Sequence, residues 1–170
     1  MTAYNLGVRG DTSLQVAARW RAEAQPRLLT GADTRIAVSF GANDTTIEDG
    51  RLRTEPAESS AALGDILAGA ASLGLSALVI GPAPVDDPEQ NQRIQALSSM
   101  FSRVCLDASV RFVSIFETLL ADPTWMSQVR QGDGAHPSAE GYDALANLIL
   151  AEGWTDWLRA TLVARTAAGG

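Results

Sequence analysis

Strand-like and helix-like segments alternate along the chain, and this alternation is the feature that most limits its fold. Three apolar segments of strand type occur at Arg35–Phe40, Ala77–Ile80 and Arg111–Phe116. Between them, apolar positions recur at helical spacing over Glu58–Leu73 and Ile94–Cys105. Such alternation favours parallel strands joined by crossover helices. We therefore expect a three-layer α/β/α sandwich around a parallel sheet.

The two ends of the chain extend this pattern. Tyr4–Leu6 is expected to form a short strand, and a helix is expected over about Ser13–Gln25. A loop containing Asp122-Pro123 should follow the third main strand. Near the other end, Gly153 should divide one helix from a last helix at Asp156–Ala164.

Size and charge exclude several functions. The 170 residues fit a single domain, 1–170. The net charge of -7 argues against a nucleic-acid partner, because phosphate binding needs a basic surface. All 13 basic residues are Arg, so Schiff-base and Ser–Lys chemistry are excluded within this chain.

Cysteine and hydropathy limit the cellular setting. The single cysteine, Cys105, cannot form an internal disulfide, and it lies on the apolar stripe of its helix, where we expect core. No apolar run approaches the about 20 residues that a membrane helix needs, and no signal-peptide pattern begins the chain. We expect a cytoplasmic protein with no membrane contact.

The segment Asp133-Gly134-Ala135-His136-Pro137 contains the only histidine, three residues after a carboxylate. Proline disfavours helical geometry at His136, so the pair is expected on a loop at a helix entrance, with Ser138 as the cap. Asp133 could then accept a hydrogen bond from the imidazole and leave the other ring nitrogen free as a base. The alternative is a simple turn followed by an ordinary histidine.

Two further segments end predicted strands at the same edge of the sheet. Asn43, in Phe40-Gly41-Ala42-Asn43-Asp44, could aim its amide at a developing oxyanion, or it could only stabilise a turn. Gly10 could offer its backbone N–H to a substrate oxygen beside a helix start, or it could only form a turn. In parallel sheets, ligands bind beyond this edge.

Together the three segments resemble the SGNH (GDSL-type) hydrolase family, in its second block (NLGVRGDTS), third block (FGAND) and fifth block (DGAHP). The resemblance covers nearly the whole chain and implies a flavodoxin-like sandwich. It implies that Gly10 and Asn43 are oxyanion donors, His136 the general base and Asp133 its partner. The implied reaction is two-step hydrolysis of a small-molecule ester through an acyl-enzyme, without metal or cofactor.

The family's first block, a strand followed by Gly-Asp-Ser with the nucleophile, is not found before Gly10. Ser13 or Thr12 could replace that serine, although the Asn-x-Gly pattern before them fits the second block better; Ser39, on a strand expected to be buried, is less favoured. We expect the first central strand to be missing from this chain. An N-terminal shortening through a mistaken start site is the preferred explanation, and a partner or second copy that completes the sheet is the other.

Two alternatives remain for the function. One is an esterase whose acyl pocket includes Trp125 and Met126, unless these residues only pack. The other is a catalytically silent domain that keeps the fold for binding or assembly. The acidic pairs Asp86-Asp87 and Glu48-Asp49 are interpreted as solvated surface rather than as metal ligands.

Overall fold

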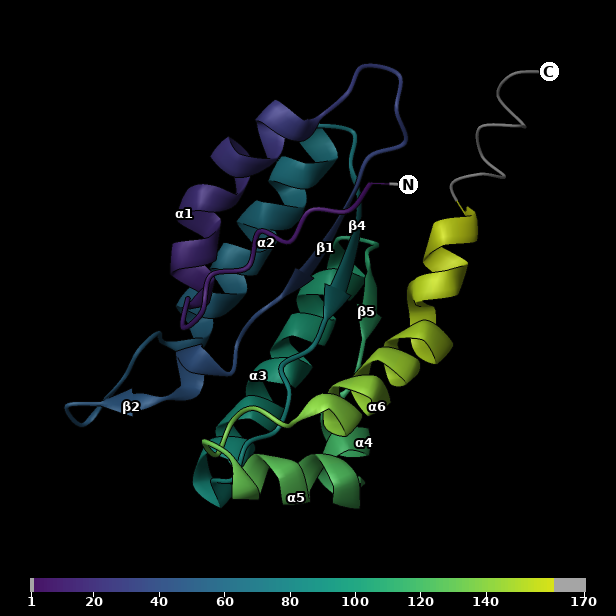
Figure 1. The fold of residues 1–170 in the computed structure, drawn as a ribbon. Coiled ribbons are helices and arrows are strands. Elements are labelled where there is room, and N and C mark those ends of the chain that lie inside the picture. Colours follow the sequence, from purple (N-terminus) through teal and green to yellow (C-terminus); the bar gives the residue numbers. More distant parts are fainter. Residues whose placement is uncertain (1, 161–170) are drawn as a thin grey trace.

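A three-stranded parallel sheet forms the centre of the protein in a computed structural model that describes residues 2–160 (Figure 1). Its strands are β1 (Arg35–Ser39), β4 (Ser76–Ile80) and β5 (Arg111–Val113), in the order β1-β4-β5. β4 pairs in parallel with both neighbours, with Val79 opposite Val38 and Phe112. The expected parallel α/β architecture is confirmed.

Helices cover both faces of the sheet, and a small antiparallel hairpin extends from the body. The remaining elements, in chain order, are α1 (Ser13–Ala24), η1 (Gln25–Arg27), η2 (Asn43–Thr45), β2 (Ile47–Glu48), β3 (Arg51–Leu52), α2 (Pro56–Ser72), α3 (Pro88–Asp107), α4 (Phe116–Ala121), α5 (Pro123–Gln131), α6 (Ala139–Ile149), η3 (Leu150–Trp154) and a helical segment at 155–160.

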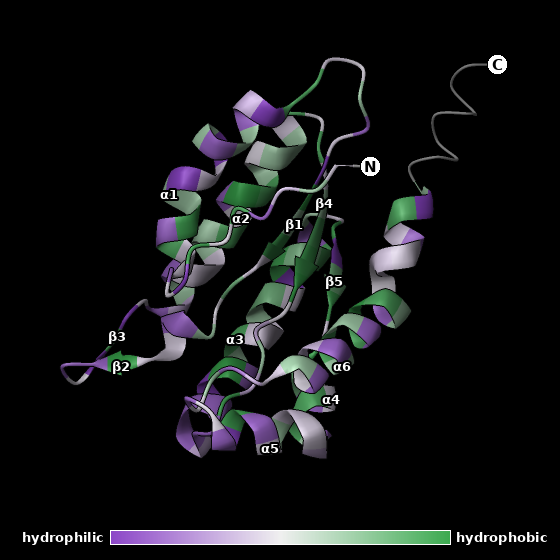
Figure 2. Cartoon of the chain, viewed as in Figure 1, coloured by the Kyte–Doolittle hydropathy of each residue, from purple (hydrophilic) through white to green (hydrophobic). Residues whose placement is uncertain are grey.

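Alternate side chains of the strands face two separate apolar cores. Val79 points into a core with Trp20 of α1, Ile66 of α2 and Phe101 of α3. Its neighbour Leu78 points to the opposite face, into a second core built from α4, α5, α6 and the last helix. Figure 2 shows β4 and most of β1 in the green of hydrophobic residues. This burial on both faces explains why the strand sequences read as continuous apolar runs.

The structure corrects several expected elements. Tyr4–Leu6 is extended but is not a strand. The third strand ends at Val113, and α4 begins at Phe116. The expected loop with Asp122-Pro123 is largely helix α5. Gly153 does lie at a kink between helices, as expected, and the last part of the predicted final helix, 161–164, lies outside the described residues.

β1 is an edge strand, and its outer side is open. Within residues 2–160, β1 pairs with β4 alone. Ala37 and Ser39 are exposed, whereas we expected Ser39 on a buried strand. The reason is that, among the described residues, no strand pairs with this side of β1. Of the helices described here, none is both long and apolar enough to cross a membrane.

Candidate active site

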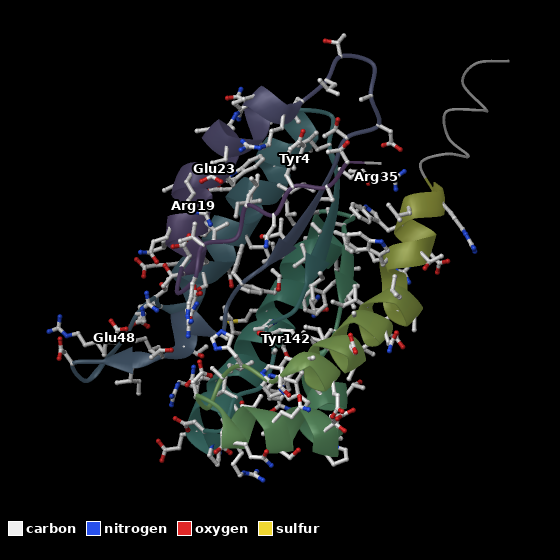
Figure 3. All side chains as sticks on the ribbon, in the orientation of Figure 1. Tyr4, Arg19, Glu23, Arg35, Glu48 and Tyr142 are labelled. Atoms are coloured by element: carbon white, nitrogen blue, oxygen red, sulfur yellow. The ribbon has the colours of Figure 1, made fainter. Side chains whose placement is uncertain are left out.

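A cavity of about 560 Å³ lies beyond the carboxyl ends of β1 and β4. It is lined by segments that are distant in sequence. They include Gly7 and Val8 before α1, the run Ser39–Asn43 after β1, Pro82 and Ala83 after β4, and the run Asp133–His136 between α5 and α6. Tyr142, labelled in Figure 3, lines the same cavity from α6. The edge of the sheet at which the three sequence segments were expected to meet is therefore hollow.

His136 is held by Asp133 through both its backbone and its ring. Asp133 Oδ1 accepts the backbone N–H groups of Ala135, at 3.0 Å, and His136, at 2.9 Å. Asp133 Oδ2 lies 2.9 Å from Nδ1 of the imidazole. The short spacing between the two residues thus forms a closed turn that fixes the ring.

The hydrogen bonds also set the charge of this pair. The contact with the His136 ring, followed by the two backbone N–H groups, lowers the pKa of Asp133 to about 2. An ionised carboxylate can only accept, so Nδ1 of a neutral imidazole must carry the proton that it donates. Nε2 then has its lone pair free, which is the form that a general base requires.

Neighbouring elements hold the His136 loop in position. The backbone N–H of Asp86 donates to the carbonyl of Gly134 at 2.7 Å, which ties the loop to the segment after β4. Gly134 has φ of +82°, a value that favours glycine. On the other side, Gln128 Oε1 accepts from the backbone of Ser138 and Gly141 at 3.1 and 2.9 Å. The base is thus anchored between α5, α6 and the β4 loop.

The two expected oxyanion donors lie on adjoining loops. Asn43 lines the cavity, and its Nδ2 donates to the carbonyl of Asp11 at 3.0 Å. One amide hydrogen is therefore used to join the loop after β1 to the loop before α1. Gly10 is exposed with φ of +82° and lies between Val8 and Asp11, which line the cavity, but it is not itself a lining residue.

Ser13 lies in a buried network rather than beside the histidine. Its side chain is fully buried, and both its Oγ–H and its backbone N–H donate to Asp44. Ser59 of α2 donates to the same carboxylate at 2.7 Å. Thr12 is also buried and forms the N-cap of α1. These positions argue against Ser13 and Thr12 as nucleophiles, whereas Ser39 is exposed and lines the cavity.

Sequence reasoning missed Arg9 and Tyr142, whereas it named Trp125 and Met126 as candidate pocket residues. Arg9 Nη2 lies 3.3 Å from Asp133 Oδ2, although the two residues are 124 positions apart in the sequence. No local sequence pattern predicts a contact between residues so far apart along the chain. Trp125 lines the cavity and packs edge-on against Tyr142, with ring centroids 6.3 Å apart. Met126, paired with Trp125 in the sequence prediction, lines a different cavity beside α3.

The acidic pairs have partners or caps. Asp86 lies 3.2 Å from Nε of Arg130, and Asp87 caps α3. Glu48 pairs with Arg53 at 3.3 Å. In residues 2–160, no group of three or more His, Cys, Asp or Glu side chains is arranged to hold a metal ion. Cys105 is fully buried, and this desolvation raises the pKa of its thiol to about 11.

Comparison with known proteins identifies the family and the fold. The model of the GDSL-like Lipase/Acylhydrolase family matches residues 1–144. No curated protein matches the sequence. Among solved structures, a GDSL-like lipase from Bacteroides thetaiotaomicron has a TM-score of 0.69 at 18% identity, covering 89% of this chain and 73% of its own.

Two further structures share the fold. The acetylxylan esterase Axe2 from Geobacillus stearothermophilus has a TM-score of 0.70 at 17% identity, with 90% of this chain and 72% of that chain covered. A lipase/acylhydrolase from Enterococcus faecalis has a TM-score of 0.62 at 22% identity, with 84% and 70% covered. At these identities the likeness establishes the fold.

Proposed function

Because this chain belongs to the GDSL-like lipase/acylhydrolase family, we propose that it hydrolyses carboxylic esters at the cavity that contains His136. The observation that carries the proposal is the Asp133–His136 pair, with Nδ1 held 2.9 Å from an ionised carboxylate inside that cavity. Small acyl groups are the first substrates to test, since two proteins of this fold are named acetylxylan esterases.

In the proposed reaction, Nε2 of His136 takes the proton of a serine hydroxyl as its oxygen attacks the ester carbonyl. Asn43 and the Gly10 N–H donate to the oxygen that becomes negative. The imidazolium then gives its proton to the leaving alcohol, which leaves an acyl-serine. Water, deprotonated by the same nitrogen, releases the carboxylic acid and regenerates the serine. Each cycle consumes one ester and one water.

The serine is proposed to come from a further strand that adds along the open side of β1. Ser13 is buried and bonded to Asp44, so it is not available to His136. The cavity runs beside Ser39 and Phe40 at the end of β1, with Val8 on its other side. A parallel strand added there would end at the cavity, as β1 and β4 do. Its source is either the same chain before Met1 or a second copy.

A silent binding domain is the second candidate. Within residues 2–160, the His136 ring is hydrogen-bonded to Asp133 and to no serine. If no serine ever reaches His136, the cavity would bind a ligand without turnover. The measurement below separates the two candidates.

Turnover of p-nitrophenyl acetate tests the proposal. We expect the chain, extended by any sequence in frame before Met1, to hydrolyse this ester. His136→Ala should lose at least about 100-fold in kcat, in line with general-base catalysis. Arg103→Ala, an exposed α3 residue at the opposite end of the sheet, is the control and should keep full turnover. Equal turnover in His136→Ala would exclude the base assignment, and no turnover in any form would favour the binding domain.

A further inference from the structure

Arg9 follows Val8, which lines the cavity, and its side chain contacts Asp133, which also lines it. Its side chain is 84% exposed, yet its guanidinium is directed at the Asp133 carboxylate, with Nη2 3.3 Å from Oδ2. This contact joins the segment before α1 to the loop that carries His136. The two segments carry the proposed oxyanion donor and the proposed base.

Arg9 and His136 use the same oxygen atom. Oδ2 of Asp133 lies 2.9 Å from Nδ1 of His136 and 3.3 Å from Arg9 Nη2. The other oxygen, Oδ1, accepts two backbone N–H groups. A carboxylate offers about four lone-pair positions, so these donors saturate it.

A cation at this position changes which form of the ring is favoured. A lone carboxylate stabilises the positively charged imidazolium, because opposite charges attract. The Arg9 charge offsets part of that attraction and repels a proton on the ring. Asp133 keeps the ring oriented through its hydrogen bonds, while its attraction for the second ring proton becomes weaker.

We propose that Arg9 is a positioning residue that shares the Asp133 carboxylate with His136 and thereby favours the neutral, proton-accepting imidazole. The proposal rests on the proposed function in one respect only, namely that a neutral His136 is the working form. The charge effect itself does not depend on turnover.

Other charged or titratable groups line the cavity, but their main contacts lie elsewhere. Arg19 pairs with Asp11 at 2.7 Å and with Glu23, two contacts that raise its pKa (Figure 3). The remaining groups are Asp86, which pairs with Arg130, Asp87, which caps α3, and Tyr142, which packs on Trp125. In the part of the chain that the structure describes, Arg9 is the arginine side chain that contacts Asp133.

His136 is the only histidine in the sequence, so its ring signals in an NMR titration are assigned without mutation. We expect the midpoint of the His136 titration to rise by roughly 0.3 to 0.5 pH units in Arg9→Gln. A shift of this size corresponds to the interaction energy between one unit charge and a protonated ring a few ångströms away in water. Arg9→Lys should keep the wild-type midpoint within about 0.2 units, since it retains the charge.

A matched control separates this local effect from a change in net charge. Arg103→Gln removes the same charge from an exposed position of α3 and should leave the midpoint unchanged. The Arg9→Gln shift should also shrink toward zero at 1 M salt, where screening acts over about 3 Å. An unchanged or lowered midpoint in Arg9→Gln, or an equal rise in Arg103→Gln, would overturn the proposal. Turnover is not used, so a failed esterase assay leaves this result interpretable.

Discussion

At the scale of single residues, the local sequence predicted the contact between Asp133 and His136, but not what surrounds the two residues. Asp133 and His136 are three positions apart, so proline and turn preferences were enough to predict their pairing. Arg9 contacts Asp133 across 124 positions of sequence, a contact that only the fold creates. Ser13 was a plausible nucleophile by residue type and by its place in the sequence. In the structure it is buried, because it donates to the Asp44 carboxylate that also accepts from Ser59 of α2.

The ionisation of Asp133 is the first residue-scale prediction. Hydrogen bonds from His136 lower the pKa of Asp133 to about 2, against an ordinary value of 3.8. The ionised form is favoured in the folded protein, so its stabilising effect is present above pH 3.8 and is lost as pH falls through 2. Carboxyl ¹³C NMR should show the Asp133 carboxyl titrating near pH 2, a signal that is absent in Asp133→Asn. A midpoint near 3.8 would contradict the turn described for this pair.

At the scale of elements, the sequence predicted the strands better than the short helices. The run from Phe112 to Phe116 is rich in the apolar residues that strands favour, yet the strand ends at Val113 and α4 begins at Phe116. Asp122-Pro123 was interpreted as a break, but Asp122 is an N-cap that accepts from Trp125 at 2.8 Å, with proline in the first turn. An aspartate followed by proline is a common start of a helix, so the sequence could have predicted α5 here. Tyr4–Leu6 has strand-type residues, but no neighbouring strand pairs with it in the described chain.

Two glycines of α2 provide an element-scale prediction. A Cβ at Gly69 would lie 2.7 Å from the buried Trp20 ring of α1, whereas a Cβ at Gly64 would meet nothing within 4 Å. We expect Gly69→Ala to destabilise the fold by about 1–3 kcal/mol through overpacking. Gly64→Ala should stabilise it by about 0.5–1 kcal/mol, because alanine is the better helix former.

Urea unfolding of both variants measures these free energies of unfolding. Each variant adds one methyl group to the same helix, so the two changes differ chiefly in what the methyl group meets. Equal effects of the same sign would show that α1 does not pack against α2 through Trp20 as described.

At the scale of the whole molecule, a cavity that contains His136 lies beside an open sheet edge. Loops at the carboxyl ends of β1 and β4, together with the loop before α6, bring Asn43 and His136 to one cavity. The same arrangement leaves Ala37 and Ser39 of β1 exposed. An open parallel edge beside the cavity that contains His136 is the structural reason to propose that an added strand supplies the serine.

Fluorophosphonate labelling, followed by peptide mass spectrometry, tests this central claim most directly, because the reagent marks only a serine that a base activates. The chain should be labelled alone and when extended by the sequence in frame before Met1. The proposal predicts a single adduct on a serine of the added segment, lost in His136→Ala, with Ser13 unmodified. An adduct on Ser13, or labelling that persists without His136, would contradict it.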